Sequence, residues 1–436
     1  MRSLIIEDKT IMNYHLKTYI KKASLLGMLT VITACQQPKE EATEPLEMNS
    51  FFPLMAWDDV RDESTIQKMS ECGINSIAFV PPTLLDACQK YGMKAIVFDQ
   101  GVTPEWDKPF KADVANKRLG ELIEKYNDHP AVYGYHLKDE PYIAEYGELG
   151  KSVEFVKQHA PGKWPYINLF PNYGFPDTGE WYAESGAGDW YKNEYLQRFV
   201  DECKGLVLSY DNYSLVGEDG FSDNYWTNLW DARSVSLQNN LPLHTIVLSV
   251  GFHGCRIPTI ADLSIQVFGA LAYGARGIAY WKFVSEVLSI CDAPELGDLR
   301  GSPLDEFGEP TAMYPLLKNL NHRISNMIPV LLKLRSDNVY HIGEIPEKHH
   351  GATEKSMIQR IEGGGNFIVG EFTHTEDGSH WVMVVNKNLK SSALFRPVYN
   401  KKYESIQYLC MKTGELKVLD PWYSIAPGQA VLLRLN

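Results

Sequence analysis

Two adjacent carboxylates, Asp139 and Glu140, are the side chains of this chain best placed to do chemistry. They lie in the stretch VYGYHLKDEP, where the β-prone run Val132–Leu137 reads as a strand that Pro141 stops. Successive side chains on a strand point to opposite faces, so we expect only one of the two acids to face the space beyond the strand. In parallel α/β proteins, chemistry takes place at that C-terminal end. Two carboxyl groups there would suit general acid–base catalysis, and the alternative interpretation is an acidic turn.

The elements that must position these acids follow a repeating pattern. Short β-prone runs alternate with candidate helices about eight times between residues 51 and 283, which is typical of a (β/α)8 barrel of about 250 residues. A doubly wound open sheet is the alternative, but such sheets usually carry a glycine-rich phosphate loop, and neither GxGxxG nor GxxxxGK occurs here. The expected strands are Phe52–Trp57, Ile74–Val80, Lys94–Phe98, Val132–Leu137, Trp164–Leu169, Leu206–Tyr210, His244–Val250 and Gly277–Trp281.

The pattern of predicted elements changes after the barrel. Pro310–Leu334 reads as one long amphipathic helix that closes the unit, so we place the barrel at residues 51–336. In residues 337–436, β-prone runs recur between turns rich in Gly, Asn and Lys, as in GNFIVGEF and GQAVLLRLN. This last segment predicts an antiparallel β-sandwich.

The composition narrows the classes of partner. The chain has 436 residues, 44% of them hydrophobic and 22% charged, which indicates a globular protein. Its net charge of -13 and the absence of a basic block beyond the first 40 residues argue against a nucleic-acid partner. No CxxC, HxH or HExxH spacing indicates a metal site, and no nucleotide motif is present, so we expect no cofactor.

The N-terminus resembles a bacterial lipoprotein signal. An apolar run, Ala23–Ala34, follows two lysines and is too short to span a membrane, and Cys35 comes directly after it. The resemblance implies that residues 1–35 are a signal peptide whose Cys35 becomes lipidated and anchors the chain to the outer membrane. Residues 36–50 then form a polar tether, and its acidic stretch 39–41 resembles the surface-export signal of Bacteroidetes lipoproteins. We expect a surface-exposed protein, and an anchor facing the periplasm is the alternative.

If the barrel forms, residues near the ends of its strands meet at one mouth. Carboxylates and amides there could hydrogen-bond hydroxyl groups while aromatic faces stack on a sugar ring, which predicts a neutral, hydroxyl-rich ligand such as a carbohydrate. The residues expected at this mouth include Trp57, Asp58, Asp139, Glu140, Asn168, Asn172, Asp211, Tyr213, Phe252, His253 and Trp281.

Three motifs resemble those of TIM-barrel glycoside hydrolases, in particular the clan that includes the retaining β-galactosidases. NDHPAVYGYHLKDEP resembles the fourth strand of these enzymes, SYDNY the end of the sixth, and LAYGARGIAYWKF the eighth. The resemblance implies that Glu140 is the general acid/base and that Trp281 forms the floor of the sugar site. Asp139 stands where the clan usually has an asparagine that binds the sugar's 2-hydroxyl group.

The seventh strand of this chain departs from the pattern of that clan. The clan's nucleophile is a glutamate at the end of the seventh strand, but the corresponding stretch here, SVGFHG, contains no carboxylate. Glycoside hydrolysis passes through an oxocarbenium-like transition state and needs one protonated and one ionised carboxyl group. Asp211 is therefore the best second catalytic residue, and Glu218 and Glu286 are poorer candidates.

The sequence thus predicts a glycoside hydrolase acting on a poly- or oligosaccharide. The missing carboxylate on the seventh strand keeps a second hypothesis open: a surface lipoprotein that binds glycan on the same barrel without cutting it. A carbohydrate-active lyase or epimerase is a weaker third possibility.

Overall fold

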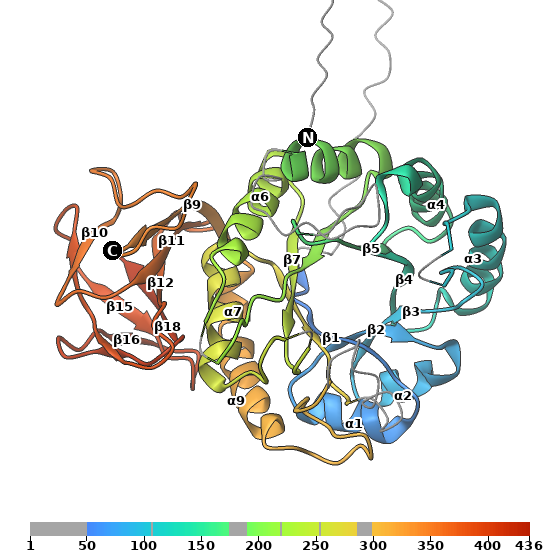
Figure 1. Cartoon of the computed structure of the whole chain (residues 1–436), viewed down its shortest axis with the longest axis horizontal. Helices are drawn as coiled ribbons and strands as arrows, with labels where there is room; N and C mark the ends of the chain where they lie inside the picture. Colours follow the sequence, from blue (N-terminus) through green and yellow to red (C-terminus); the bar gives the residue numbers. More distant parts are fainter. Residues whose placement is uncertain (1–49, 106–107, 174–189, 219, 253, 286–298) are drawn as a thin grey trace, which may run out of the picture. The chain divides into compact units, whose positions relative to one another are not determined.

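The structure is a computed structural model that describes residues 50–105, 108–173, 190–218, 220–252, 254–285 and 299–436 (Figure 1). The predicted signal peptide and tether with Cys35, and also His253 and Glu286, lie outside these ranges. Within them, no helix combines the length and the apolarity that crossing a membrane requires.

Eight parallel strands form a closed barrel in which each strand pairs with the next and β8 pairs back to β1, so the predicted fold is confirmed. Every predicted strand is present, with its ends shifted by two residues at most. The strands are β1 Leu54–Asp59, β2 Ser76–Val80, β3 Lys94–Val97, β4 Val132–Asp139, β5 Trp164–Leu169, β6 Leu208–Asp211, β7 Leu243–Leu248 and β8 Gly277–Trp281.

Helices surround the barrel strands on the outside (Figure 1). The first of them shows how local sequence sets the ends of a helix: the Asp62 side chain accepts a hydrogen bond from the backbone N–H of Thr65, and Gly73 follows the last turn with a φ of 82°. The helices are α1 Glu63–Glu71, α2 Leu85–Lys90, α3 Ala112–Tyr126, α4 Tyr146–His159, α6 Asn224–Gln238, α7 Ile260–Ala272, α9 Met313–Ser325 and α10 Ile328–Leu331, with 3-10 turns at Pro82–Leu84 and Ile143–Glu145 and π-helical turns at Tyr191–Leu196 and Phe199–Cys203.

The single long helix expected over Pro310–Leu334 is wrong. The chain forms two helices there, α9 and the short α10, with a break at Asn326–Met327. Pro329 explains the break, because proline has no backbone N–H and its ring collides with the carbonyl of the residue four positions earlier.

A six-stranded antiparallel sheet in the order β16-β15-β18-β12-β11-β9 follows the barrel, together with two two-stranded sheets, β10-β14 and β13-β17. Side chains point alternately to the two faces of the six-stranded sheet: Ile368 and Met383 join the barrel's apolar core, whereas Val369 and Val384 join a separate core. At Gly370 a Cβ would collide with the backbone oxygen of Ala272 at the end of α7. The strands are β9 Leu334–Ile342, β10 Ile358–Glu362, β11 Phe367–His374, β12 His380–Asn386, β13 Ala393–Leu394, β14 Arg396–Tyr399, β15 Ile406–Leu409, β16 Leu416–Val418, β17 Ser424–Ile425 and β18 Ala430–Leu435.

Candidate active site

A cavity of about 500 Å³ lies where the barrel strands end, a volume typical of small-molecule sites. Eight of the residues expected at the mouth line it: Trp57, Asp139, Glu140, Asn168, Asp211, Tyr213, Phe252 and Trp281. The structure adds Tyr173 and Cys255 to the lining.

Both adjacent acids face this cavity, so the expectation that only one would do so is wrong. The strand ends at Asp139, and Glu140 adopts a left-handed backbone conformation with a φ of 47°, which interrupts the alternation of side chains. Such a conformation costs a non-glycine residue about 1–3 kcal/mol, and strained residues of this kind cluster at functional sites. Two hydrogen bonds hold it in place: the Glu140 N–H donates to the Asn168 carbonyl at 2.9 Å, and the Tyr195 hydroxyl donates to the Pro141 carbonyl at 2.9 Å.

Asn168 connects two of the carboxylates. Its side-chain Nδ2 donates to Asp139 Oδ1 at 3.1 Å and to Asp211 Oδ1 at 2.9 Å. The barrel provides this arrangement because Asp139, Asn168 and Asp211 lie near the ends of three successive strands, with Asp139 in register with Asn168. The Ser209 hydroxyl donates to Asn168 Oδ1 at 2.9 Å and so orients the amide.

The pKa values of the connected acids are raised. Burial raises the pKa of Asp139 to about 6, and hydrogen bonds donated by Asn168 and Trp57 oppose that effect. Burial also raises the pKa of Asp211 to about 8, and the nearby charge of Asp139 adds to it. Because two like charges so close are unfavourable, the pair holds one proton between its two carboxyl groups near neutral pH.

Aromatic rings form another side of the cavity. Trp281 stacks on Tyr213 with ring centroids 5.1 Å apart and an interplanar angle of 21°. Phe252 packs edge-on against Trp281 at 4.5 Å. Trp57 also lines the cavity; it is 4% exposed and packs edge-on against Phe79. The cavity therefore combines flat apolar faces with a cluster of acids, which suits a ring-shaped, hydroxyl-bearing ligand.

Asp58 was expected at the mouth but does not line the cavity. Its Oδ2 accepts hydrogen bonds from the backbone N–H groups of Phe283 at 3.0 Å and Val284 at 2.8 Å, and its Oδ1 lies 3.6 Å from Lys282 Nζ. Burial raises its pKa to about 6, although the positive charge of Lys282 opposes this. Asp58 thus fastens the chain that follows β8.

Asn172 does not line the cavity either. Its amide exchanges two hydrogen bonds of 2.7 Å with the amide of Asn224, and its backbone N–H donates to Asn228 Oδ1 at 3.0 Å. Both amides are satisfied by these contacts between the loop after β5 and helix α6. Glu218, the poorer candidate for the second carboxylate, is exposed and outside the cavity lining.

Asn168 was expected at the mouth together with Asn172, because it is the next-to-last residue of the predicted strand Trp164–Leu169, and of the two only Asn168 lines the cavity. Cys255 carries no comparable sequence signal. It enters the site through the irregular loop after β7, where its backbone forms an isolated antiparallel β-bridge with Phe252.

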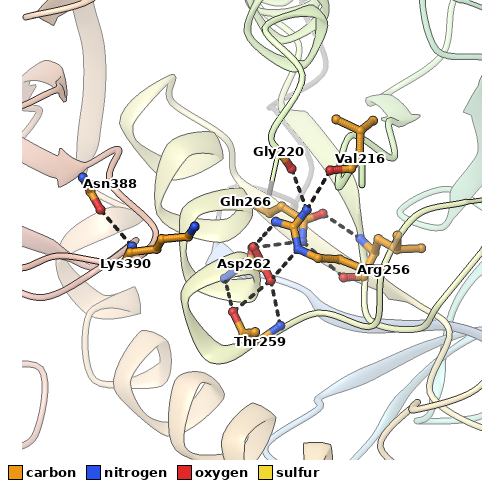
Figure 2. A network of polar contacts seen from close by, with 9 residues as sticks. Val216, Gly220, Arg256, Thr259, Asp262, Gln266, Asn388 and Lys390 are labelled. Carbon is orange, nitrogen blue, oxygen red and sulfur yellow. Dashed lines mark hydrogen bonds and ion pairs between the residues drawn. The ribbon is translucent and has the colours of Figure 1, made fainter. Parts of the chain in front are cut away.

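Arg256 ties the two loops that hold this side of the cavity (Figure 2). Its Nη2 forms an ion pair with Asp262 Oδ1 at 2.5 Å, and its Nη1 donates to the carbonyls of Gly220 at 2.6 Å and Val216 at 3.2 Å. Asp262 also accepts hydrogen bonds from Thr259 and so caps helix α7. The loops after β6 and β7 therefore share one buried anchor.

Replacing Arg256 by alanine is expected to destabilise the protein by about 3–5 kcal/mol, because it leaves the Asp262 carboxylate buried without its partner. Denaturant unfolding monitored by intrinsic fluorescence measures this free energy. The matched control is Arg61→Ala, which removes a solvent-exposed ion pair with Asp59 and should change stability little. Equal effects of the two substitutions would show that the buried pair does not anchor the loops.

In the part of the chain that the structure describes, no group of three or more His, Cys, Asp and Glu side chains is arranged to hold a metal ion. The five cysteines in that part, Cys72, Cys88, Cys203, Cys255 and Cys410, are free thiols.

The sequence matches no protein-family model and no curated protein. Among solved structures, a glycoside hydrolase of family 5 from Bacteroides vulgatus has a TM-score of 0.56 at 11% identity, covering 88% of this chain and 89% of that chain. Another structure described as a glycoside hydrolase has a TM-score of 0.53 at 12% identity, covering 88% of this chain and 92% of that chain. At such identities the likeness shows the fold alone, which these two glycoside hydrolases share with this chain over 88% of its length.

Proposed function

We propose that the chain is a glycosidase that hydrolyses O-glycosyl bonds in a poly- or oligosaccharide. The observation that carries this proposal is the lining of one cavity, which combines Glu140, the two acids Asp139 and Asp211 that Asn168 connects, and stacked aromatic rings. The fold likeness to glycoside hydrolases agrees with it.

In the proposed reaction, Glu140 is the proton donor and Asp211 is its catalytic partner. Glu140 protonates the glycosidic oxygen as the bond from that oxygen to the anomeric carbon breaks, so the leaving group departs as a neutral alcohol. The Asp139–Asp211 pair carries one negative charge, which stabilises the positive charge that develops on the sugar. A water molecule supplies the new oxygen on the anomeric carbon, and its proton returns to the carboxylates.

Two further groups shape the substrate in this proposal. Trp281 and Tyr213 provide stacked rings for the apolar face of the sugar, and Asp139, held by Asn168 and Trp57, accepts hydrogen bonds from its hydroxyl groups. No step requires a metal ion or an organic cofactor, because the carboxyl groups supply both the acid and the negative charge.

The experiment is an assay of sugar release by the purified protein on a panel of aryl glycosides and of plant and host glycans. Wild type, Glu140→Gln and the exposed control Glu218→Gln are compared on every substrate. Release by wild type and by the control, with loss in Glu140→Gln, supports the hydrolase. Release from plant or host glycans that persists at the wild-type rate in Glu140→Gln contradicts it.

A non-catalytic glycan-binding protein is the second candidate, and one observation favours it: β7 and the described residues that follow it, up to Phe252, contain no carboxylate. Binding and release distinguish the two functions. A binding protein would retain glycans with equal affinity in wild type and Glu140→Gln, and neither form would release sugar from any glycan that it binds.

We also infer a lipid anchor on Cys35 at the outer membrane, facing the cell exterior. The support is the sequence pattern alone: the apolar run before Cys35 and the polar, acidic stretch after it. Cys35→Ser is expected to move the protein from the membrane fraction to the soluble fraction and to abolish incorporation of labelled fatty acid. Retention in the membrane fraction would contradict this, and protease treatment of intact cells tests the outward orientation.

A further inference from the structure

A second cavity, of about 370 Å³, lies within the C-terminal sheets, apart from the barrel residues that form the first. It is lined by residues of β14, by Ile406 at the start of β15, and by the segment from Leu419 to Trp422 between β16 and β17. Its volume falls in the range of small-molecule sites.

Trp422 is the most conspicuous residue of this cavity, because 71% of it is exposed to solvent. A turn presents its ring: the Trp422 N–H donates to Asp420 Oδ1 at 2.7 Å, and the N–H of Tyr423 donates to the Asp420 carbonyl at 3.0 Å. Because Trp422 both is exposed and lines the cavity, its ring offers a flat face on which a ligand in the cavity can stack.

Polar groups accompany this aromatic surface. The guanidinium of Arg396 lies 4.5 Å from the centroid of the Trp422 ring, and it forms no ion pair with any acid in the described ranges. The cavity thus offers one flat ring and, on Arg396, donors that no acid in the described ranges engages.

The charges of the lining residues indicate which class of ligand this cavity could bind. Arg396 and Asp420 bring one positive and one negative charge to the same cavity, which favours a neutral ligand over a polyanion. A protein partner usually requires a flat contact of about 800 Å² on each side, whereas this site is a small hollow. A neutral ring with an apolar face and several hydroxyl groups fits both the indole and the guanidinium donors.

We propose that this cavity is a second carbohydrate-binding site, in which a sugar ring of a glycan stacks on Trp422 and its hydroxyl groups accept hydrogen bonds from Arg396. The choice of a glycan rests in part on the proposed function of the barrel. Such a site would hold a polymeric substrate on the protein while the barrel cavity acts on it, and it would not affect small substrates.

The test measures binding separately from hydrolysis. Binding to each glycan of the panel is measured by affinity electrophoresis and calorimetry, with Glu140→Gln as the parent so that the glycan is not degraded. Adding Trp422→Ala is expected to weaken binding to polymeric glycan roughly five- to tenfold, since one stacking contact is lost. Phe307→Ala is the matched control, because Phe307 is 76% exposed but does not line the cavity.

A second readout uses Trp422→Ala in the otherwise unchanged enzyme. Hydrolysis of aryl glycosides should stay at the wild-type rate, and hydrolysis of the polymer should slow at low polymer concentration. Binding that is as strong in Trp422→Ala as in its parent overturns the second site. A change in oligomeric state in place of a change in binding also overturns it, and indicates a protein interface.

The second site and the hydrolase can fail independently. If wild type releases no sugar but binds glycan in a way that Trp422→Ala weakens, the second site stands and the hydrolase falls. If wild type releases sugar and Trp422→Ala changes neither binding nor polymer hydrolysis, the hydrolase stands and the second site falls. If no glycan binds to the protein, the second site is overturned.

Discussion

Glu140→Gln is expected to lower kcat on natural glycans by roughly 10²–10⁴-fold, the usual contribution of a positioned general acid. Glutamine keeps the size and shape of the side chain but cannot donate the proton that the leaving oxygen needs. The backbone hydrogen bonds that hold this position remain in the variant, so folding should be unaffected. Steady-state kinetics on the glycan that wild type hydrolyses fastest measures the loss.

The leaving group provides an internal check on that result. Aryl glycosides with an acidic phenol need little protonation, so Glu140→Gln should lose much less activity on them than on the glycan. An equal loss on both kinds of substrate would show that Glu140 does not act as the acid. Glu218→Gln, an exposed carboxylate outside the cavity lining, should behave as wild type on both.

Asp211→Asn is expected to give an inactive protein that is more stable than wild type at neutral pH. The loss of activity, again roughly 10²–10⁴-fold in kcat, follows because the substitution removes the proposed partner of Glu140. The gain in stability follows because the folded state holds the Asp211 carboxyl at a pKa of about 8, far above the value of about 4 for an aspartate in an unfolded chain. An amide avoids the penalty of burying this acid, and we expect the unfolding temperature to rise by roughly 2–5 °C.

The stability gain should depend on pH with a defined sign. Because the folded state raises the pKa of Asp211, its favourable contribution is fully present below pH 4 and is lost as the pH rises toward 8. The variant should therefore match wild type in unfolding temperature near pH 4 and exceed it progressively up to pH 8. Calorimetric scans across this range measure the difference.

Asp99→Asn is the control of opposite sign. Hydrogen bonds from Arg118 lower the pKa of Asp99, so this carboxylate stabilises the folded state above pH 4, and its removal should lower the unfolding temperature at neutral pH.

If Asp211→Asn retains the wild-type kcat, Asp139 alone supplies the negative charge. If Asp211→Asn lowers the stability of the protein at pH 8, the folded state does not hold the Asp211 carboxyl in its protonated form.

The strands of the barrel and the acids at their ends were predictable because the signals are local. Runs of β-branched and aromatic residues mark the strands, and Gly73 marks the end of a helix by the conformation that it alone adopts readily. Once eight such units are counted, the closure of the sheet brings the strand ends to one mouth, and Glu140, Asp211 and Trp281 follow from their positions at those ends. The break at Pro329 was also local, and the amphipathic pattern around it concealed it.

What the sequence by itself determined is therefore which residues stand at the ends of the strands, because hydrophobic periodicity and turn residues act over a few positions along the chain. Only the tertiary structure decided what those residues contact. Asp58 is satisfied by backbone N–H groups 225 and 226 residues further along the chain, and Asn168 connects Asp139 and Asp211 from a third strand between them. Such pairings depend on which strands become neighbours in the closed barrel, and that is set by packing over the whole chain.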